Sequence, residues 1–198
     1  MGENMNIIKP ALLKNGDSIG ILAPSGAMDN DTNLKRGISF FEKRGFKVKL
    51  ADNIYSSNRY LAGSDKERLD AIHKMFSDKS INAIICLRGG YGAIRLINQI
   101  DYNVIRENPK IFCGYSDITA LNVMFLKRAG LSTYSGPMIM SDFGQENLCD
   151  YTINKFFQTV QEGKFDYEGK FWGGNLSTLV SLCGQDFIPD FKFTLFLE

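Results

Sequence analysis

Short apolar runs alternate with longer stretches of helical periodicity along the first 130 residues. The runs of strand length are residues 18–23 (SIGILA), 82–87 (NAIICL) and 111–114 (IFCG). Apolar residues recur at helical spacing in residues 30–44, 64–78, 93–100 and 117–130. Strands that are apolar throughout and that alternate with helices are typical of a parallel sheet buried on both faces. The pattern therefore predicts an α/β fold, a parallel sheet with helices on both faces.

Several of these predicted elements carry recognisable end signals. Gly45 and Gly130 follow the first and last helical stretches, where a helix C-terminus favours glycine. Ser64 and Glu67 stand in capping-box register at the start of the second helix. Residues 46–50 (FKVKL) alternate apolar and basic side chains, which predicts a strand at the margin of the sheet.

The regular alternation stops at about residue 145. The stretch QEGKFDYEGK is polar and lacks clear periodicity, FWGGNLSTLVSLCGQDF predicts a turn leading into a short apolar helix, and LFLE predicts a strand. We therefore predict an N-terminal α/β domain over residues 1–145, a linker over 146–170, and the start of a smaller, incomplete C-terminal domain over 171–198. Such an incomplete domain is expected to expose apolar side chains, including Trp172 and Leu179.

Composition narrows the classes of function. The 198 residues are 44% hydrophobic, and 23 Lys and Arg balance 22 Asp and Glu. Because no basic stripe is present, nucleic acid is not expected as a partner. The beginning of the chain lacks a signal-peptide pattern, and no apolar window is long enough for a membrane span. The four cysteines are widely spaced, and Cys86 and Cys113 lie in apolar runs, which favours reduced thiols in a cytoplasmic protein without a metal site or cofactor.

Three unusual loops follow predicted strands: PSG (24–26), RGGYG (88–92) and GYSD (114–117). Ligands of open parallel sheets bind beyond the carboxyl ends of the strands, so these loops are expected to meet at one site. RGGYG is neither a P-loop nor a dinucleotide fingerprint. Its adjacent glycines either bring backbone N–H groups close to a ligand or simply form a tight turn.

Ser116, in GYSD, has two interpretations. A serine on a sharp strand-to-helix turn is a candidate nucleophile, with the Asp117 N–H facing the oxyanion. The same serine is also a good N-cap, and Ile118 departs from the Gly-x-Ser-x-Gly pattern of hydrolases, so the local residues favour the cap. The only histidine, His73, lies on the predicted helix over 64–78 and is expected to be a partly exposed helix residue rather than a base.

A set of motifs that runs in order from Lys9 to Glu198 resembles the serine LD-carboxypeptidases, the muramoyltetrapeptide carboxypeptidase family that includes microcin C self-immunity peptidases. The motifs are APSG, YLAGSDKERLDAIHKMFSD, RGGYGAIRLI, GYSDITALN, WGGNLSTLVSLCGQDF and LFLE. The resemblance implies a two-domain enzyme with a Ser-His-Glu triad. Ser116 matches the nucleophile, which reverses the local preference for a cap, and Glu198 matches the triad glutamate.

Further site residues follow from the same resemblance. The N–H groups of Asp117 and of Gly89 or Gly90 match the oxyanion hole. Arg88 is a candidate counter-charge for the substrate carboxylate. Tyr91 and Ser25, in two of the loops, complete the predicted substrate-binding set.

The function implied is hydrolysis of murein tetrapeptides, with release of the terminal D-alanine during cell-wall recycling, by a homodimeric enzyme that needs no metal. The catalytic histidine of the family follows the glutamate by several dozen residues, so this chain resembles an enzyme truncated within its C-terminal domain and is expected to be inactive. Three alternatives stay open: an immunity peptidase acting on an aminoacyl-nucleotide antibiotic, an inactive fragment or binding module, and a flavodoxin-like sensor of small ligands, which fold analogy alone supports.

Overall fold

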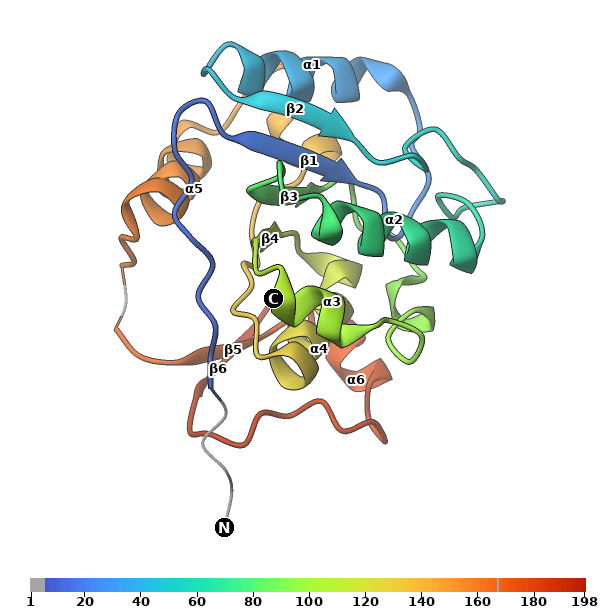
Figure 1. Ribbon diagram of the computed structural model, residues 1–198, viewed down its shortest axis with the longest axis vertical. Coiled ribbons are helices and arrows are strands. Elements are labelled where there is room, and N and C mark those ends of the chain that lie inside the picture. The colour runs from blue at the N-terminus through green and yellow to red at the C-terminus, as the bar shows by residue number, and fades with distance from the viewer. Residues whose placement is uncertain (1–5, 167) are drawn as a thin grey trace.

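A four-stranded parallel sheet forms the centre of the computed structural model, which describes residues 6–166 and 168–198 (Figure 1). Its strands, in spatial order, are β2 (Lys47–Leu50), β1 (Ser18–Leu22), β3 (Ala83–Cys86) and β4 (Ile111–Cys113). Every neighbouring pair runs parallel. The predicted parallel sheet is confirmed, with the strand that alternates apolar and basic residues at its edge.

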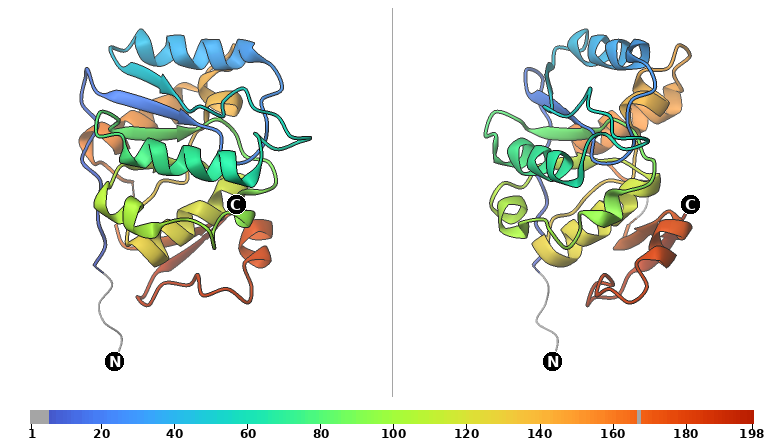
Figure 2. Two further views of the ribbon diagram at one scale, coloured as in Figure 1. Left: turned by 45° about the vertical axis from the view of Figure 1, so that its right-hand side comes forward. Right: turned by 90° about the vertical axis from the view of Figure 1, so that its right-hand side faces the viewer.

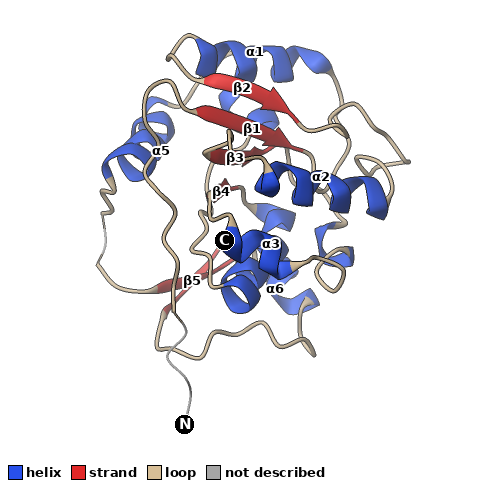
Figure 3. Cartoon of the chain, viewed as in Figure 1, coloured by secondary structure: helices blue, strands red, loops and turns tan. Residues whose placement is uncertain are grey.

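Helices cover both faces of this sheet (Figure 3). They are α1 (Asp31–Glu42), α2 (Asp65–Ser77), α3 (Tyr102–Glu107), α4 (Thr119–Met124) and α5 (Asp150–Glu162). Successive strand residues point to opposite faces. Ile84 accordingly packs with α2, α3 and α4 in one core, whereas Ile85 packs with α1 and α5 in the other. The predicted cover on both faces is therefore confirmed.

The helix ends largely follow their sequence signals. Ser64 and Glu67 form the complete capping box at the start of α2. Gly45 and Gly130 take left-handed φ angles of 84° and 74° after α1 and after the π-helical turn Phe125–Ala129 that extends α4. At these angles glycine avoids the clash that a Cβ would cause.

The expected helix over residues 93–100 is reduced to the 3₁₀ turn Ala93–Arg95. The Arg95 carbonyl, which would accept the Gln99 N–H in an α-helix, accepts the Gln99 side-chain amide at 3.0 Å instead. The Gln99 N–H donates to the Leu96 carbonyl at 2.8 Å, which is a tighter, 3₁₀-type bond. The chain instead forms α3, which the sequence pattern did not predict.

A second difference concerns the segment predicted as a linker over residues 146–170. Residue 167 lies outside the described residues, but α5 occupies the middle of the segment. Its residues Ile153, Phe156 and Val160 are buried in the core, and the Leu13 N–H donates to the Val160 carbonyl at 2.8 Å. This part of the predicted linker is therefore a core helix, because its apolar positions recur at helical spacing.

The last residues form a small unit against α4 (Figure 2). Strands β5 (Phe171–Gly174) and β6 (Thr194–Leu197) pair in parallel, and α6 (Leu176–Ser181) lies between them in sequence. FWGG is thus a strand and not the expected turn, because Gly173 and Gly174 adopt φ angles of 144° and 143°. At Gly173, a Cβ would lie 1.9 Å from the Phe196 carbonyl oxygen.

The expected exposure of Trp172 and Leu179 is wrong. Both side chains are buried, only 7% and 6% exposed, because they pack with Leu182 and Phe187 in the core that also contains α4. The apolar side chains that the unit does expose are Phe171, Leu176, Val180, Ile188, Leu195, Phe196 and Leu197.

None of the helices in the described residues combines the length and apolarity that crossing a bilayer requires. The first five residues of the chain, part of the stretch without a signal-peptide pattern, lie outside the described part.

Candidate functional site

Ser116 lies on a strained elbow between β4 and α4. Its φ angle is 60°, which for a residue with a side chain is uncommon. Within the described chain its hydroxyl caps neither the 3₁₀ turn Ser116–Ile118 nor α4. The local preference for an N-cap is therefore not supported, and the sharp strand-to-helix turn expected of a nucleophile is present. Strain of this kind concentrates at functional sites.

We expect Ser116→Gly to be more stable than Ser116→Ala by about 1 kcal/mol. Both variants lack the hydroxyl, but only glycine takes φ near 60° without a Cβ clash. Urea denaturation of the two variants measures the difference. If residue 116 had an ordinary φ angle, Ser116→Ala would be the more stable variant. Finding Ser116→Ala more stable than Ser116→Gly would therefore show that the elbow is not strained in solution.

The Asp117 carboxylate joins the three loops that follow strands β1, β3 and β4. Its Oδ2 accepts hydrogen bonds from the Ser25 hydroxyl (2.5 Å), the Gly92 N–H (3.0 Å) and the Ala93 N–H (2.9 Å). Asp117 is only 5% exposed, so these bonds form away from water. The three loops predicted to meet at the carboxyl ends of the strands do meet, and one carboxylate oxygen holds them together.

Ser25 does not contact a ligand from this position. Its side chain is completely buried, and its hydroxyl is used by Asp117. A direct substrate contact of the Ser25 side chain therefore has no support in this structure, because its hydroxyl points to Asp117 and the interior. Its observed role is to orient Asp117.

The glycine loop lies directly against the elbow. A Cβ added to Gly89 would lie 3.1 Å from the Ser116 Cβ and 3.3 Å from its Oγ. The Gly89 carbonyl accepts from the Gly26 N–H at 3.2 Å, so the next N–H, that of Gly90, points away from Gly26 because the peptide is trans. The Asp117 N–H has no acceptor within the described chain. The oxyanion hole itself stays a prediction.

Glu198 reaches the elbow from the end of β6. Its Oε1 accepts a hydrogen bond from the Ser116 N–H at 2.9 Å. The elbow is fixed from the same side by Asn175, whose N–H donates to the Thr119 hydroxyl at 3.0 Å, and by a close approach of Gly174 to Thr119. Two residues assigned to the triad by resemblance, 82 positions apart, are therefore neighbours in space.

No base for Ser116 is evident among the described side chains. The His73 Nε2 accepts from the Asp101 N–H at 2.9 Å, between α2 and α3, so the histidine is a half-buried helix residue as expected. Burial raises the pKa of the Tyr115 phenol and of the Cys86 and Cys113 thiols. These groups are therefore neutral near pH 7 and serve neither as base nor as competing nucleophile.

An open pocket of about 390 Å³ lies in front of Ser116. Arg88 forms one wall, but its guanidinium pairs with Asp29 and donates to the Ala27 carbonyl at 3.3 Å. Tyr91, whose side chain is 70% exposed, lines an adjoining pocket and not this one. Residues between α4 and α5 also line the pocket in front of Ser116, including Met138 and Met140. The structure thus brings Arg88 and Gly89 to Ser116 and leaves Tyr91 farther out.

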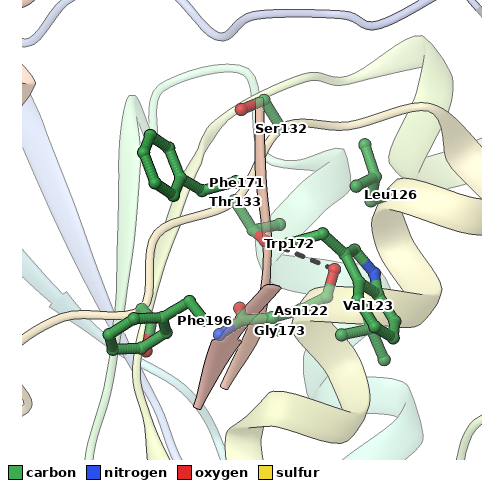
Figure 4. Close-up of a pocket in the computed structure, with 10 residues that line it drawn as sticks. Asn122, Val123, Leu126, Ser132, Thr133, Phe171, Trp172, Gly173 and Phe196 are labelled. Atoms are coloured by element: carbon green, nitrogen blue, oxygen red, sulfur yellow. Dashed lines mark hydrogen bonds between the residues drawn. The ribbon is translucent and has the colours of Figure 1, made fainter. Parts of the chain in front are cut away.

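A separate cavity of about 180 Å³ lies between α4 and the strands β5 and β6 (Figure 4). Phe171, Trp172 and Phe196 line it from the strands, and among the other lining residues the Thr133 hydroxyl donates to the Asn122 carbonyl at 3.3 Å. Ser116 does not line this cavity. It belongs to the contact between the last unit and α4 and not to the site.

Arg68 is a supporting residue that the sequence did not reveal. Its side chain is fully buried, and it donates to the carbonyls of Pro24 (2.8 Å) and Gly92 (3.0 Å) while pairing with Asp65. Arg68 therefore holds the PSG and RGGYG loops together. An arginine beside the apolar stripe of a helix looks like a surface residue, so no local signal marks it.

In the described part of the chain, no three His, Cys, Asp or Glu side chains are grouped so that they could hold a metal ion. The four cysteines are free thiols, two of them buried in β3 and β4 as predicted.

Comparison with known proteins gives consistent matches. Residues 19–136 match the LD-carboxypeptidase N-terminal domain. A probable murein peptide carboxypeptidase of Bacillus subtilis is 38% identical over 206 residues, which cover 96% of this chain and 64% of that protein. This chain therefore spans slightly less than two thirds of the length of that relative.

Solved structures agree with the sequence matches. An MccF-like protein from Bacillus anthracis is 32% identical with a TM-score of 0.88, over 96% of this chain and 69% of the other. The microcin C7 self-immunity protein MccF in complex with aspartyl sulfamoyl adenosine is 26% identical with a TM-score of 0.86, over 96% of this chain and 70% of the other.

Proposed function

Since this chain belongs to the LD-carboxypeptidase family, we propose that it carries the nucleophile of a serine enzyme that releases the terminal D-alanine of murein tetrapeptides. The observation that carries the proposal is the left-handed elbow at Ser116, which faces an open pocket and lies against Gly89. The name of the Bacillus subtilis relative supports the class of substrate.

In the proposed reaction, the Ser116 Oγ attacks the carbonyl that precedes D-alanine. The negative charge that develops on that carbonyl oxygen faces the Asp117 N–H and an N–H of Gly89 or Gly90, and such donors contribute most when they are held in place beforehand. The amine of D-alanine leaves with a proton, and water then hydrolyses the acyl-enzyme. The Ser116 N–H takes no part, because Glu198 occupies it.

A serine hydroxyl needs a base to become a nucleophile. The one histidine of this sequence is bound to Asp101, so we propose that the base is an imidazole supplied by polypeptide outside these 198 residues. Glu198 uses Oε1 for Ser116, which leaves Oε2 to accept a hydrogen bond from that imidazole and so to fix its tautomer. By itself the chain is proposed to bind substrate and to turn over very little.

A chimera tests this function. The chain is joined at Glu198 to the carboxy-terminal segment of the Bacillus subtilis relative, and D-alanine release from L-alanyl-γ-D-glutamyl-meso-diaminopimelyl-D-alanine is measured. We expect turnover by the chimera and a loss of at least about a thousandfold in kcat for Ser116→Ala, because the remaining oxyanion contacts and binding cannot replace a nucleophile.

Ser141→Ala is the matched control, since Ser141 lines the same pocket and its hydroxyl bonds to Asp142. It is expected to change kcat less than about tenfold. An active chimera that keeps its rate after Ser116→Ala would refute the proposed nucleophile. A folded chimera that releases no D-alanine would refute the proposed substrate class.

The second candidate is hydrolysis of an aminoacyl-nucleotide antibiotic, which the similarity to an MccF-like protein and to MccF bound to aspartyl sulfamoyl adenosine favours. The same chimera distinguishes the two functions when it is incubated with aspartyl sulfamoyl adenosine. A chimera that binds this nucleotide but releases no D-alanine from the tetrapeptide would favour the immunity function.

We further propose that the enzyme acts in the cytoplasm, where peptides recovered from the cell wall are recycled, and that it acts as a homodimer. The division into domains is revised: α5 packs with the first domain, and the second begins at β5.

A further inference from the structure

A second pocket, of about 440 Å³, adjoins the one in front of Ser116. The two pockets share the residues Asp29, Arg88 and Gly90, so the Arg88–Asp29 ion pair lies on their common border. A peptide that occupies the first pocket can therefore extend into the second. Gly90 lines both pockets, but Ser116 and Glu198 do not line the second.

The far wall of the second pocket is a tight hairpin between β2 and α2, which projects beyond the carboxyl end of the sheet (Figure 1). Asn58 and Leu61 close it with two backbone hydrogen bonds of 2.9 and 3.1 Å. Arg59 stands at the first central position with a φ angle of 58°. Glycine is the usual residue there, so an arginine held in this conformation marks a position where the side chain has a use.

The charge of Arg59 is not compensated. Among the described residues its guanidinium has no ion-pair or hydrogen-bond partner. The other arginine of the pocket, Arg88, is paired with Asp29, which is also the pocket's only carboxylate. Arg59 therefore makes the second pocket electropositive, and its planar fork of donors fits a carboxylate.

Two tyrosines give the pocket apolar walls. The side chains of Tyr60 and Tyr91 are 56% and 70% exposed, and both line the pocket. Exposed rings beside an unpaired arginine are typical of binding surfaces, because they reduce the contact of a bound ion with water.

We propose that Arg59 is a specificity residue that binds a carboxylate of the peptide substrate in this second pocket, on the far side of the Arg88–Asp29 pair from Ser116. The inference rests on the proposed function, because it assumes a peptide at Ser116. A murein tetrapeptide with lysine at its third position offers two carboxylates, the terminal one of D-alanine and the α-carboxylate of the γ-linked D-glutamyl residue. A diaminopimelate at that position adds a third, which the lysine form used below leaves out.

Binding to the 198-residue chain tests the proposal without turnover. The probes are L-alanyl-γ-D-glutamyl-L-lysyl-D-alanine, its carboxy-terminal amide, and its D-isoglutamine form. We expect Arg59→Ala and Arg59→Gly each to weaken binding of the first probe about tenfold, and Arg59→Lys to weaken it less. One of the two amidated probes lacks the carboxylate that Arg59 binds. The unmodified chain should bind that probe about tenfold more weakly than the first probe, whereas Arg59→Ala should bind the two with equal affinity.

Arg59→Gly guards against a folding artefact, because glycine suits the φ angle of 58° better than arginine does. Lys43→Ala, at an exposed position after α1, removes the same charge away from both pockets and should leave binding unchanged. Equal affinity of the unmodified chain and both neutral variants would overturn the role of Arg59 and leave the proposed function intact. If the folded, unmodified chain binds none of the three probes, the proposed function fails as well.

Discussion

Asp117→Ala is expected to lower the free energy of unfolding by about 3 kcal/mol, since it leaves three buried donors without an acceptor. The Ser25 hydroxyl and the N–H groups of Gly92 and Ala93 all bond to one oxygen of this carboxylate. Water reaches them poorly, because Asp117 and its partner Ser25 are buried. Urea denaturation at neutral pH measures the loss.

Asp117→Asn separates the contribution of the charge from that of the oxygen. The amide retains one acceptor oxygen in the same position. We therefore expect Asp117→Asn to lower the free energy of unfolding by about half as much as Asp117→Ala does. Asp70→Ala is the surface control, because Asp70 is exposed and paired only with Lys66; its effect should stay below about 0.5 kcal/mol. A loss of the same small size for Asp117→Ala would mean that the three loops are held by other contacts.

Gly173→Ala is expected to break the pairing of β5 with β6. The added Cβ would lie 1.9 Å from the Phe196 carbonyl oxygen, at a φ angle of 144° that side chains avoid. We expect a loss of about 3 kcal/mol or more in the stability of the last unit, the range typical of severe backbone conflicts. Trp172, the only tryptophan, is buried in β5 and reports this directly, because its fluorescence moves to longer wavelength when water reaches the ring.

Gly184→Ala provides the comparison. Gly184 also has a positive φ angle, 95°, but a Cβ there would meet nothing within 4 Å, so only the backbone strain of about 1 kcal/mol remains. Identical Trp172 emission and identical denaturation midpoints in the two variants would show that the close approach of β5 to β6 does not exist in solution.

The strands and the first two helices could be predicted from the sequence because each depends on local pattern, and the meeting of the three loops followed from the geometry of a parallel sheet. Apolar runs mark β1, β3 and β4, and Ser64 with Glu67 marks the start of α2. The carboxyl ends of parallel strands lie at one edge of a sheet, so the loops after them meet wherever the strand order places them as neighbours.

The errors concern hydrogen bonds and contacts that apolar spacing does not reveal. The Gln99 side chain takes the Arg95 carbonyl, and the helix expected over residues 93–100 is reduced to one 3₁₀ turn. Whether Ser25 faces a pocket or the interior depends on where the Asp117 carboxylate lies, and a single sequence does not contain that information. The neighbouring positions of Ser116 and Glu198 were implied only by resemblance, since 82 residues separate them.

The single oxygen of Asp117 also limits how the site can be re-engineered. A loop from a relative cannot be grafted in place of RGGYG alone, because its Gly92 and Ala93 amides share their acceptor with Ser25 of a different loop. A shift of one donor changes the position of the oxygen for the other two. The loops after β1, β3 and β4 therefore have to be replaced together when they are exchanged for those of a relative.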